Sequence, residues 1–220
     1  MKVTIEGIFL RINKYQRVTF SEKRKRKLNN DKFTIISNNC WGGMIYESYN
    51  LEKQTPTVGL FIHSSDYIKF IKDLKKYLNT NLVFINPNDS KYKDNYKNIK
   101  KFGTYPIGKL LDIEIHFLHY KSEEEAFEKW NRRLKRIDWD HIIYKFNDQN
   151  GFKDDDLVEF LKLPYKNKIF FTCKDFGINN PTIIKIKQNK LLFGNKQINS
   201  SHEPFGNSKY IDINNLINKL

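Results

Sequence analysis

Short apolar runs alternate with helix-forming segments along most of this chain, and this alternation restricts the fold more than any other feature of the sequence. The runs have the length and the β-branched and aromatic content of buried strands. Expected strands cover residues 33–37, 57–62, 82–85, 112–119, 141–146, 168–173 and 182–186, and expected helices cover 64–78, 122–137, 155–163 and 212–219. This order favours an α/β fold, so we expect a mostly parallel or mixed central sheet with helices on both faces.

A basic segment precedes this pattern. The 220 residues include 39 Lys+Arg and 25 Asp+Glu, which gives a formal net charge of +14. Residues 11–28 contain eight basic side chains and one acid, Glu22, so half of the surplus lies there. We therefore divide the chain into a basic N-terminal segment, 1–31, and a single α/β domain, 32–220. The basic segment suits either a solvated helix, for which Ser21 is the expected N-cap, or contact with an anionic membrane.

Composition also limits the expected location of the protein and the kinds of partner that it can bind. No apolar run approaches the roughly 20 residues that cross a bilayer, and the opening MKVTIEGIFLR lacks the small-residue cleavage site of a signal peptide. Cys40 and Cys173 are too few for a cysteine-based zinc site, and we expect reduced thiols. These features predict a cytoplasmic protein, with peripheral contact to an anionic membrane through residues 11–28. No nucleic-acid-binding motif accompanies the charge, so nucleic acid is not the expected partner.

The loop at residues 37–43, Ser-Asn-Asn-Cys-Trp-Gly-Gly, follows the first expected strand and opens a helix. Ligands of open α/β sheets bind beyond the carboxyl ends of strands, and a helix start offers free amides to an anion. Asn38 and Asn39 can add side-chain amides. Gly42 and Gly43 would let a ligand approach the backbone closely. The expected ligand-binding residues are Asn38, Asn39, Trp41, Gly42, Gly43, His63, Arg132 and Arg133.

Cys40 is the candidate nucleophile of this loop. A thiol at a helix N-terminus can have its pKa lowered by the helix dipole, which favours the reactive thiolate. In that case His116 or His119 would act as the general base, and nearby amides would hold an oxyanion. The alternative is that Cys40 packs beside Trp41 as a small apolar side chain, as unpaired cysteines usually do.

The expected strand at 112–119 alternates polar and apolar residues. A period of two places Asp112, Glu114 and His116 on one face. These three residues and His119 are catalytic candidates, because a carboxylate beside a histidine raises its basicity. The same face could instead bind a metal ion, but the sequence offers no clear second pair of ligands, so no metal site is predicted.

The expected helix at 122–137 ends in a basic face. Its start, Ser122 followed by three glutamates, has the pattern of a capping box. Arg132 and Arg133 could together bind a phosphate or carboxylate of a sugar nucleotide or an acidic glycan. The alternative is ion pairing with glutamates on the same helix. Arg133 lies three residues after Trp130, close to the apolar stripe, where solvation alone explains an arginine poorly.

Residues 33–43, which contain this loop, resemble the opening of an uncharacterised bacterial family. Similar blocks follow at 56–62, at 105–108 with 112–120, and at 122–137. Members of that family are often described as exopolysaccharide or capsular polysaccharide biosynthesis proteins and sometimes as acyltransferases, and the family is catalogued as a domain of unknown function. The resemblance covers roughly residues 30–215 and implies a cytoplasmic α/β protein of glycan-assembly gene clusters. It transfers no catalytic residues to this chain.

The leading hypothesis from the sequence is a transferase that acts on precursors of capsular polysaccharide or exopolysaccharide. In its slightly favoured acyl-transfer form, the attacking group is Cys40 or a water molecule, activated by His116 or His119. Asn38, Asn39 and the loop amides would hold the oxyanion. No cofactor is predicted, and acetyl-CoA or a nucleotide sugar would serve as the donor substrate.

In the glycosyl-transfer form, the loop holds a diphosphate that Arg132 and Arg133 neutralise. Asp112 or Glu114 then acts as the base. The expected partner is an anionic glycan precursor or a nucleotide-linked donor. The alternative function is a non-enzymatic glycan- or nucleotide-binding module of a polysaccharide-assembly complex.

Overall fold

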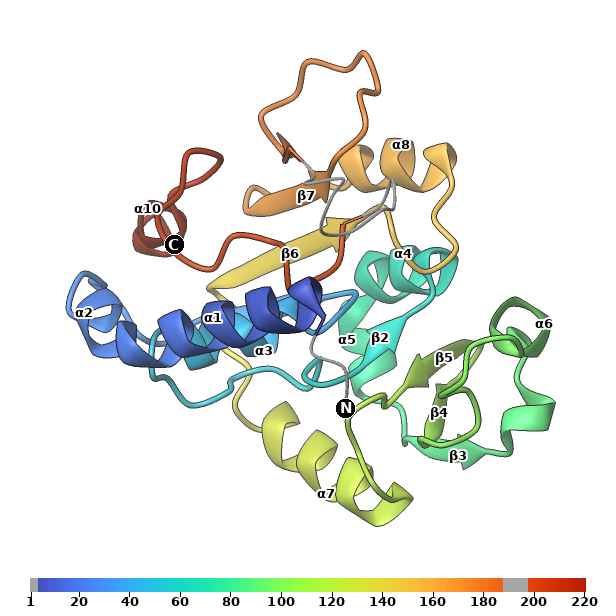
Figure 1. Cartoon of the computed structure of the whole chain (residues 1–220). Coiled ribbons are helices and arrows are strands. Elements are labelled where there is room, and N and C mark those ends of the chain that lie inside the picture. Colours follow the sequence, from blue (N-terminus) through green and yellow to red (C-terminus); the bar gives the residue numbers. More distant parts are fainter. Residues whose placement is uncertain (1–3, 188–197) are drawn as a thin grey trace.

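The strands of this protein form two separate four-stranded sheets. A computed structural model describes residues 4–187 and 198–220, and Figure 1 shows its parallel sheet above its antiparallel one. The parallel sheet has the order β1 (Thr34–Ser37), β6 (Ile142–Asn147), β7 (Lys168–Thr172) and β8 (Ile183–Lys185). The antiparallel sheet has the order β2 (Phe61–Ile62), β5 (Ile113–His116), β4 (Ile107–Leu110) and β3 (Val83–Ile85).

The helices connect and cover these strands. They are α1 (Ile5–Thr19), α2 (Ser21–Lys25), α3 (Trp41–Ser48), α4 (Ser64–Lys72), α5 (Leu74–Leu78), α6 (Lys93–Tyr96), α7 (Glu123–Leu134), α8 (Asp154–Lys162) and α10 (Ile213–Asn218), with a 3₁₀ turn η1 (Pro87–Asp89). The helix expected at 64–78 is broken in two, because Asp73 leaves helical geometry with φ −137° and ψ 55°. The residue at the N-cap of α2 is Phe20 and not Ser21, whose hydroxyl instead donates to the Val18 carbonyl.

The parallel sheet separates two apolar cores, as the alternation of side chains along a strand requires. On one face, Ile35 and Ile143 pack with α3 and α10. On the other face, Ile36 and Tyr144 pack with α4, α8 and the inner face of the antiparallel sheet. The expected α/β class with helices on both faces of a parallel sheet is therefore confirmed.

The antiparallel sheet is a departure from the expected topology, which had one mostly parallel or mixed central sheet. The apolar run at 57–62 contributes only Phe61 and Ile62 to a strand, and the alternating run at 112–119 contributes Ile113–His116. β4 and β5 form a tight hairpin, in which Leu110 faces Ile113 and Leu111 adopts a positive φ of 52°. β4 and β5 are thus antiparallel neighbours joined without a crossover helix.

Candidate functional site

The carboxyl ends of β1 and β6 lie side by side, and the loop at 37–43 leaves the first of them. The two strands are parallel neighbours with Ser37 beside Lys145. Asn38 and Asn39 follow at once, and both side chains are buried. The loop therefore lies at the carboxyl edge of the parallel sheet, where ligands of such sheets bind.

A buried ion pair contacts this loop. Lys145 and Glu203 are both fully buried, and the Lys145 Nζ lies 2.8 Å from the Glu203 Oε1. The Nζ also donates a 2.9 Å hydrogen bond to the Asn39 Oδ1. Removal from water disfavours both charges, so burial lowers the pKa of Lys145 and raises the pKa of Glu203, while each partner's charge opposes the shift.

Neither member of the pair was among the site residues expected from the sequence. Lys145 lies inside the apolar run at 141–146, and a lysine in a strand buried along its whole length is a signal that could have marked it. Glu203 lies in a polar stretch beyond the last sheet strand and has no such signal. Its partner is 58 positions away, so only the folded chain reveals the contact.

Side-chain amides connect the ion pair to the surrounding loops. The Asn147 Nδ2 donates to the Glu203 Oε1 at 2.7 Å and to the Gln149 Oε1 at 3.1 Å. The Asn147 Oδ1 accepts from the Asn38 Nδ2 at 2.8 Å, and the Asn39 Nδ2 donates to the same Gln149 oxygen at 3.3 Å. An amide both donates and accepts, so this network can orient polar groups of either kind.

Two carboxylate oxygens in this region are buried without a hydrogen-bond partner in the described part of the chain. They are the Oε2 of Glu203 and the Oδ1 of Asp148. The other oxygen of Asp148 accepts from the Thr172 hydroxyl at 2.8 Å, and burial raises the pKa of this carboxyl. A buried polar atom without a partner is costly, and such atoms concentrate where a ligand or a proton completes the arrangement.

A pocket of about 330 Å³ opens between the two sheets next to this network. Its polar side is formed by loops at the carboxyl edge of the parallel sheet, and its apolar side by β2, the end of β5 and the segment around α6. The lining residues are Asn39, Cys40, Gln149, Asn150, Asn199 and Ser200 on the polar side, and Phe61, Tyr96, Ile99, Lys101, Tyr105 and Leu118 on the other. Aromatic faces opposite amide groups are suited to a ligand that is both flat and polar.

Cys40 lines this pocket, but its sulfur is held as a thiol. The Sγ lies 3.7 Å from the Leu60 carbonyl oxygen. Burial raises the pKa of Cys40 to about 11, and the nearby charge of Lys145 only partly opposes this. At neutral pH the reactive thiolate is therefore scarce, which does not support the expected activation by the start of α3.

Glu114 and His116 share a face of β5, as the alternation predicted, whereas Asp112 lies apart from them. The His116 Nε2 is 3.9 Å from the Glu114 Oε2, and the imidazole stacks on Phe61 at 4.5 Å between ring centroids. Burial lowers the pKa of His116 to about 3, so its ring is neutral. Asp112 is exposed and bonds to Lys69 and Tyr77, which holds its pKa at about 2.

Glu114 and His63 contact the segment that connects β3 to β4. Glu114 accepts hydrogen bonds from the Ser90 hydroxyl at 2.6 Å and the Lys91 amide at 2.9 Å. His63 stacks on Tyr92 with 3.8 Å between centroids, and burial lowers its pKa to about 4. Burial also lowers the pKa of His119. The described residues that line the pocket include no histidine.

The remaining residues of the loop pack the interior. Trp41 is buried, and its indole Nε1 donates to the Pro204 carbonyl at 2.8 Å. A Cβ on Gly43 would lie 2.9 Å from the Val58 Cγ1, and one on Gly42 would lie 3.2 Å from the Ile35 Cγ2. These two glycines therefore bring α3 close to its neighbours, and the structure gives them no role toward a ligand.

Arg132 and Arg133 point to different partners. Arg132 is exposed and forms a 2.7 Å ion pair with Glu128 on the same helix. Arg133 is buried, and its Nη1 donates to the Tyr120 hydroxyl, which in turn donates to the Val58 carbonyl. The two guanidinium groups do not form a common clamp, because adjacent helical positions lie about 100° apart around the axis.

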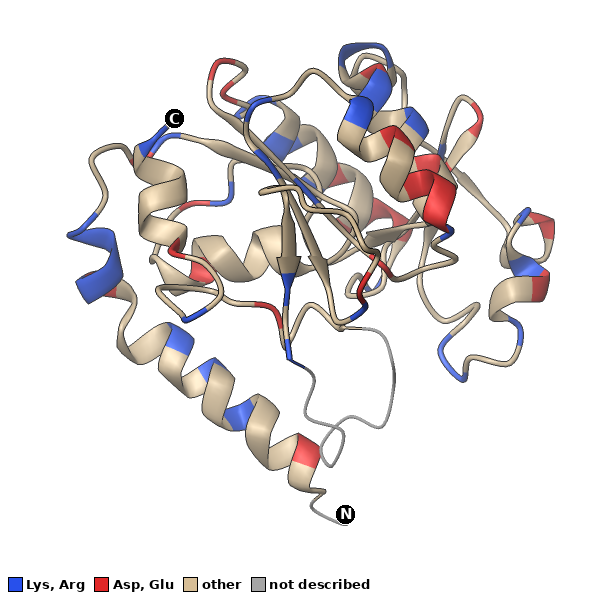
Figure 2. Cartoon of the chain, turned by 90° about the horizontal axis from the view of Figure 1, so that it is seen from above, with Lys and Arg blue, Asp and Glu red and all other residues tan. Residues whose placement is uncertain are grey.

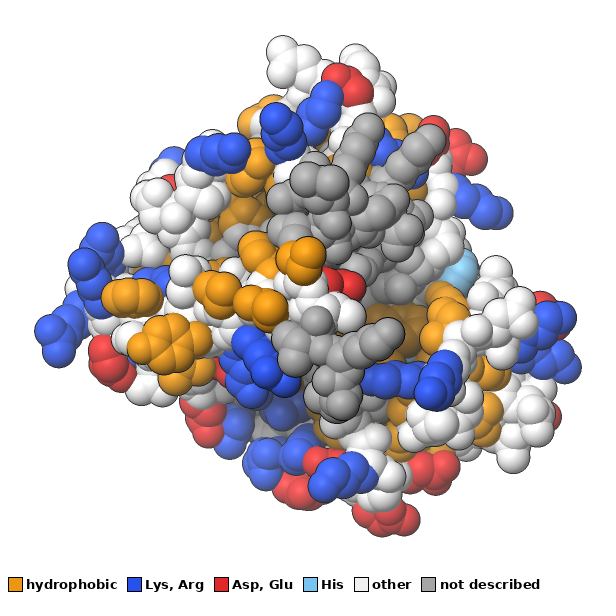
Figure 3. All heavy atoms as spheres, viewed as in Figure 1, with side chains coloured by type: hydrophobic (Ala, Val, Ile, Leu, Met, Phe, Trp, Pro, Cys, Tyr) orange, Lys and Arg blue, Asp and Glu red, His pale blue; other side chains and the backbone are white. Residues whose placement is uncertain are grey.

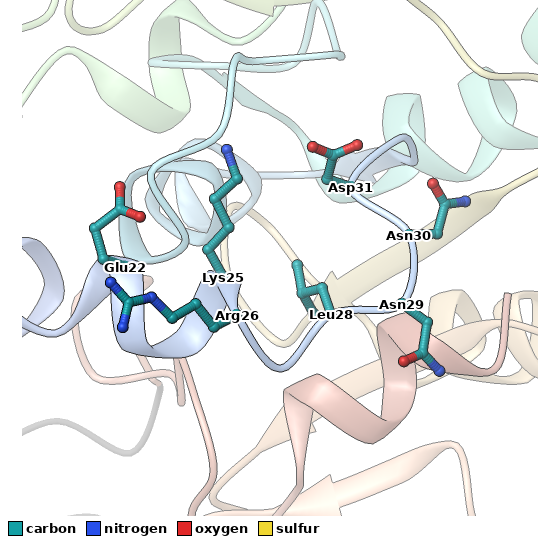
Figure 4. Close-up of a pocket in the computed structure, with 7 residues that line it drawn as sticks. All are labelled: Glu22, Lys25, Arg26, Leu28, Asn29, Asn30 and Asp31. Carbon is teal, nitrogen blue, oxygen red and sulfur yellow. The ribbon is translucent and has the colours of Figure 1, made fainter.

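Other places in the described part of the chain are weaker candidates for a ligand site. No group of three or more His, Cys, Asp or Glu side chains within residues 4–187 and 198–220 is arranged to hold a metal ion. A hollow of about 450 Å³ lies beside α2 (Figure 4). Lys25 and Arg26 face it, but so do the carboxylates of Glu22 and Asp31, and such mixed charge does not favour a simple anion.

Fold and site together define an α/β protein with a polar and aromatic pocket at the carboxyl edge of its parallel sheet. The chain belongs to the family described as a domain of unknown function, DUF1919, which matches residues 11–219. The match thus begins inside the basic N-terminal segment. An uncharacterized protein of Haemophilus influenzae is 35% identical over 165 residues, which cover 75% of this chain and 73% of that protein. Across the part of the chain that the structure describes, no helix combines the length and apolar character needed to span a membrane.

Proposed function

We propose that this protein is a cytoplasmic transferase that acts on a precursor of capsular polysaccharide or exopolysaccharide, and that the pocket between the sheets binds its substrates. The observation that carries the proposal is the Lys145–Glu203 pair, which Asn39 and Asn147 connect to the pocket wall. A buried charge pair next to a pocket at the carboxyl edge of a parallel sheet is typical of a site that performs chemistry.

The lining of the pocket favours a polyhydroxylated ligand. Asn39, Gln149, Asn150 and Asn199 present side-chain amides, which can donate to and accept from sugar hydroxyls. The rings opposite them can stack against the apolar face of a sugar or against a nucleotide base. A volume of about 330 Å³ suits one such unit and not a long polymer.

The protonation states favour direct transfer over a covalent cysteine intermediate. A thiol whose pKa is about 11 and histidines whose pKa values are about 3 and 4 do not form a thiolate–imidazolium pair. In direct transfer, an acceptor hydroxyl attacks the donor carbon, the donor bond breaks toward its leaving group, and a base accepts the hydroxyl proton. We assign the base to Glu203, because burial raises its pKa and its Oε2 has no partner among the described residues. Glu203 lies behind the residues that line the pocket, so the hydroxyl proton would reach it through one water molecule.

The test begins with ligand binding. Thermal unfolding would be measured with nucleotide sugars, acetyl-CoA and anionic glycans, since a ligand at 100 times its Kd stabilises a protein by about 2.7 kcal/mol. Ile99→Trp, at the exposed rim of the pocket, should abolish the shift. Val83→Trp, which replaces an equally exposed side chain outside the pocket, should leave the shift unchanged. A shift that survives Ile99→Trp would place the ligand elsewhere.

A second measurement separates the two transfer routes. The donor identified by the thermal shift would be incubated with wild-type protein and with the Cys40→Ala variant, and the transferred group would be followed. Direct transfer predicts that both proteins form product at similar rates. Loss of product with Cys40→Ala, at unchanged thermal stability, would instead establish covalent catalysis by Cys40.

The second candidate function is a non-enzymatic glycan- or nucleotide-binding module. It is favoured by the neutral state of Cys40 and of the histidines, which leaves the pocket without an activated nucleophile. This function predicts ligand-dependent stabilisation without any product, whichever acceptor is added.

A further inference from the structure

Helix α1 turns Phe9, Leu10, Asn13 and Arg17 toward the protein and leaves a row of apolar side chains exposed to the solvent. Arg17 is buried, and its Nε lies 3.1 Å from the Glu47 Oε2. Asn13 donates to the Ser201 carbonyl at 3.3 Å. A helix of a globular protein normally turns its apolar stripe toward the core, so this exposed apolar row requires an explanation other than core formation.

Six apolar side chains occupy that outward side and the turn after it. Their exposed fractions are 70% for Ile5, 46% for Ile8, 49% for Ile12, 68% for Tyr15, 53% for Val18 and 48% for Phe20. The spacing of Ile5, Ile8, Ile12 and Tyr15 places them along one stripe of the helix. Figure 3 shows hydrophobic side chains gathered along this helix on the face of the molecule in view. We call these six side chains the α1 row.

Basic side chains accompany the α1 row. They lie on α1 and α2 and in the turn that follows, as the blue positions in Figure 2 show. The exposed ones are Arg11, Lys14, Lys23, Arg26 and Lys27. Glu6 and Glu22 are the acids within the two helices, and Glu22 is engaged by a hydrogen bond from Asn50. The apolar row on α1 is therefore accompanied by cations on the same helix and on α2 at its end.

We propose that α1 and α2 form a docking surface for an anionic lipid bilayer, with α1 lying in the plane of the membrane. Helices that lie in the interface have an apolar stripe flanked by Lys and Arg, because the stripe enters the acyl boundary while the cations meet acidic headgroups. α1 has 15 residues and is thus about 22 Å long, which suits a position along the surface.

Charge and shape favour a membrane over the other possible occupants. A second copy of this chain would bring two cationic surfaces together, and like charges oppose such a contact. Nucleic acid would engage the cations but would leave the exposed isoleucines without a partner. The α1 row stands on a convex helix and not in a groove, so it suits a broad fluid surface better than a peptide.

The inference does not depend on the proposed function, since the docking surface and the pocket share no residue. Its test is co-sedimentation of the full chain with vesicles. We expect binding to vesicles of phosphatidylcholine containing phosphatidylglycerol, weak binding to phosphatidylcholine alone, and loss of binding at high salt. A Tyr15→Trp variant should show a blue shift of its added tryptophan emission on the anionic vesicles.

Two double variants identify the contact. Ile8→Asp/Ile12→Asp should weaken vesicle binding by about tenfold or more, because it places carboxylates in the apolar stripe. The control is Val83→Asp, an exposed apolar side chain on the antiparallel sheet, which should bind like the wild type. Arg11→Gln/Lys14→Gln should weaken binding to anionic vesicles and reduce its salt dependence. All changed side chains are exposed, so circular dichroism and thermal midpoints should match the wild type.

Three results would overturn the proposal. One is failure of the wild-type chain to bind anionic vesicles. Another is equal binding by wild type and Ile8→Asp/Ile12→Asp. The third is a concentration-dependent dimer in sedimentation that Ile8→Asp/Ile12→Asp disrupts while vesicle binding is absent, which would assign the α1 row to a second copy of the chain.

Discussion

The Nζ of Lys145 lies 2.8 Å from the Oε1 of Glu203, and both side chains are fully buried. The pair connects the centre of the parallel sheet to a segment near the C-terminal end of the chain. Asn39 accepts a hydrogen bond from Lys145 and Asn147 donates one to Glu203, so protein amides replace part of the water around the charges, while the Glu203 Oε2 has no partner among the described residues. The candidate site is thus constructed around a contact that costs free energy to desolvate and is stable only when both partners are present.

Removal of one partner of this pair should destabilise the protein strongly. Lys145→Met leaves the Glu203 carboxylate buried without a counter-charge, and we expect the free energy of unfolding to fall by roughly 3–5 kcal/mol. Urea denaturation followed by circular dichroism would measure the change.

The matched control is the double variant Lys145→Met/Glu203→Leu. It removes both charges and should recover a large part of the lost stability, because apolar side chains of similar volume can replace a buried ion pair. Additive losses from the two single changes would show that the two groups do not interact.

Cys40 should react slowly with alkylating reagents. Its pKa of about 11 leaves roughly one thiolate in a thousand at pH 8. Burial raises the pKa of Cys173 as well, but this thiol is less deeply buried, so we expect iodoacetamide to label Cys173 faster than Cys40, as measured by peptide mass spectrometry. Preferential labelling of Cys40 would restore it as a nucleophile candidate.

The two arginines of α7 should differ in their effect on stability. Arg133→Met removes a buried guanidinium that donates to the Tyr120 hydroxyl, so unfolding should become easier by roughly 1.5–3 kcal/mol. Arg132→Ala breaks an exposed ion pair with Glu128 and should cost less than about 1 kcal/mol. Chemical denaturation of both variants tests this, and equal small losses combined with weaker ligand binding would support an anion clamp instead.

Acid should destabilise the protein through His116. Burial holds the folded-state pKa of His116 at about 3, well below its ordinary value of 6.5, so the unfolded chain binds this proton more readily. The stability that neutral His116 contributes is therefore present above pH 6.5 and is lost as the pH falls.

The effect of this single residue can be isolated. Between pH 6.5 and 5.0, we expect His116→Gln to reduce the slope of unfolding free energy against pH by up to about 1.4 kcal/mol per pH unit. The slope is the readout because the substitution also changes packing against Phe61. An unchanged slope would mean that His116 titrates normally in the folded chain.

The spacing of hydrophobic residues predicted most of the strands and helices, and also the position of the loop at 37–43. The strands at β1, β6, β7 and β8 and the helices α7 and α8 occur close to where hydrophobic spacing predicted them. The loop at 37–43 lies at the carboxyl edge of the parallel sheet because any loop after a β1 strand of this fold must lie there. Pairing between strands was less predictable, since the run at 112–119 contains no sign of whether its neighbour is parallel or antiparallel.

The chemistry of the candidate residues could not be predicted in the same way. The sequence places Cys40 at a helix start, which lowers a thiol pKa, but desolvation by the fold has the larger effect and raises it. Adjacent arginines invite a shared role, yet helical geometry directs Arg133 inward and Arg132 outward. A lysine inside an apolar strand can be recognised in the sequence, as Lys145 shows. Its partner Glu203 can be identified only from the tertiary contact.

The sequence by itself determined the α/β class, the order of the main elements, the loop at the carboxyl edge and the concentration of positive charge before residue 28, because each depends on short-range periodicity or on composition. The tertiary structure decided the separation into two sheets, the Lys145–Glu203 pair, the pocket between the sheets and the outward face of α1. These features depend on which distant segments exclude water from one another, and that exclusion sets both the pKa values of the site and the surfaces left exposed.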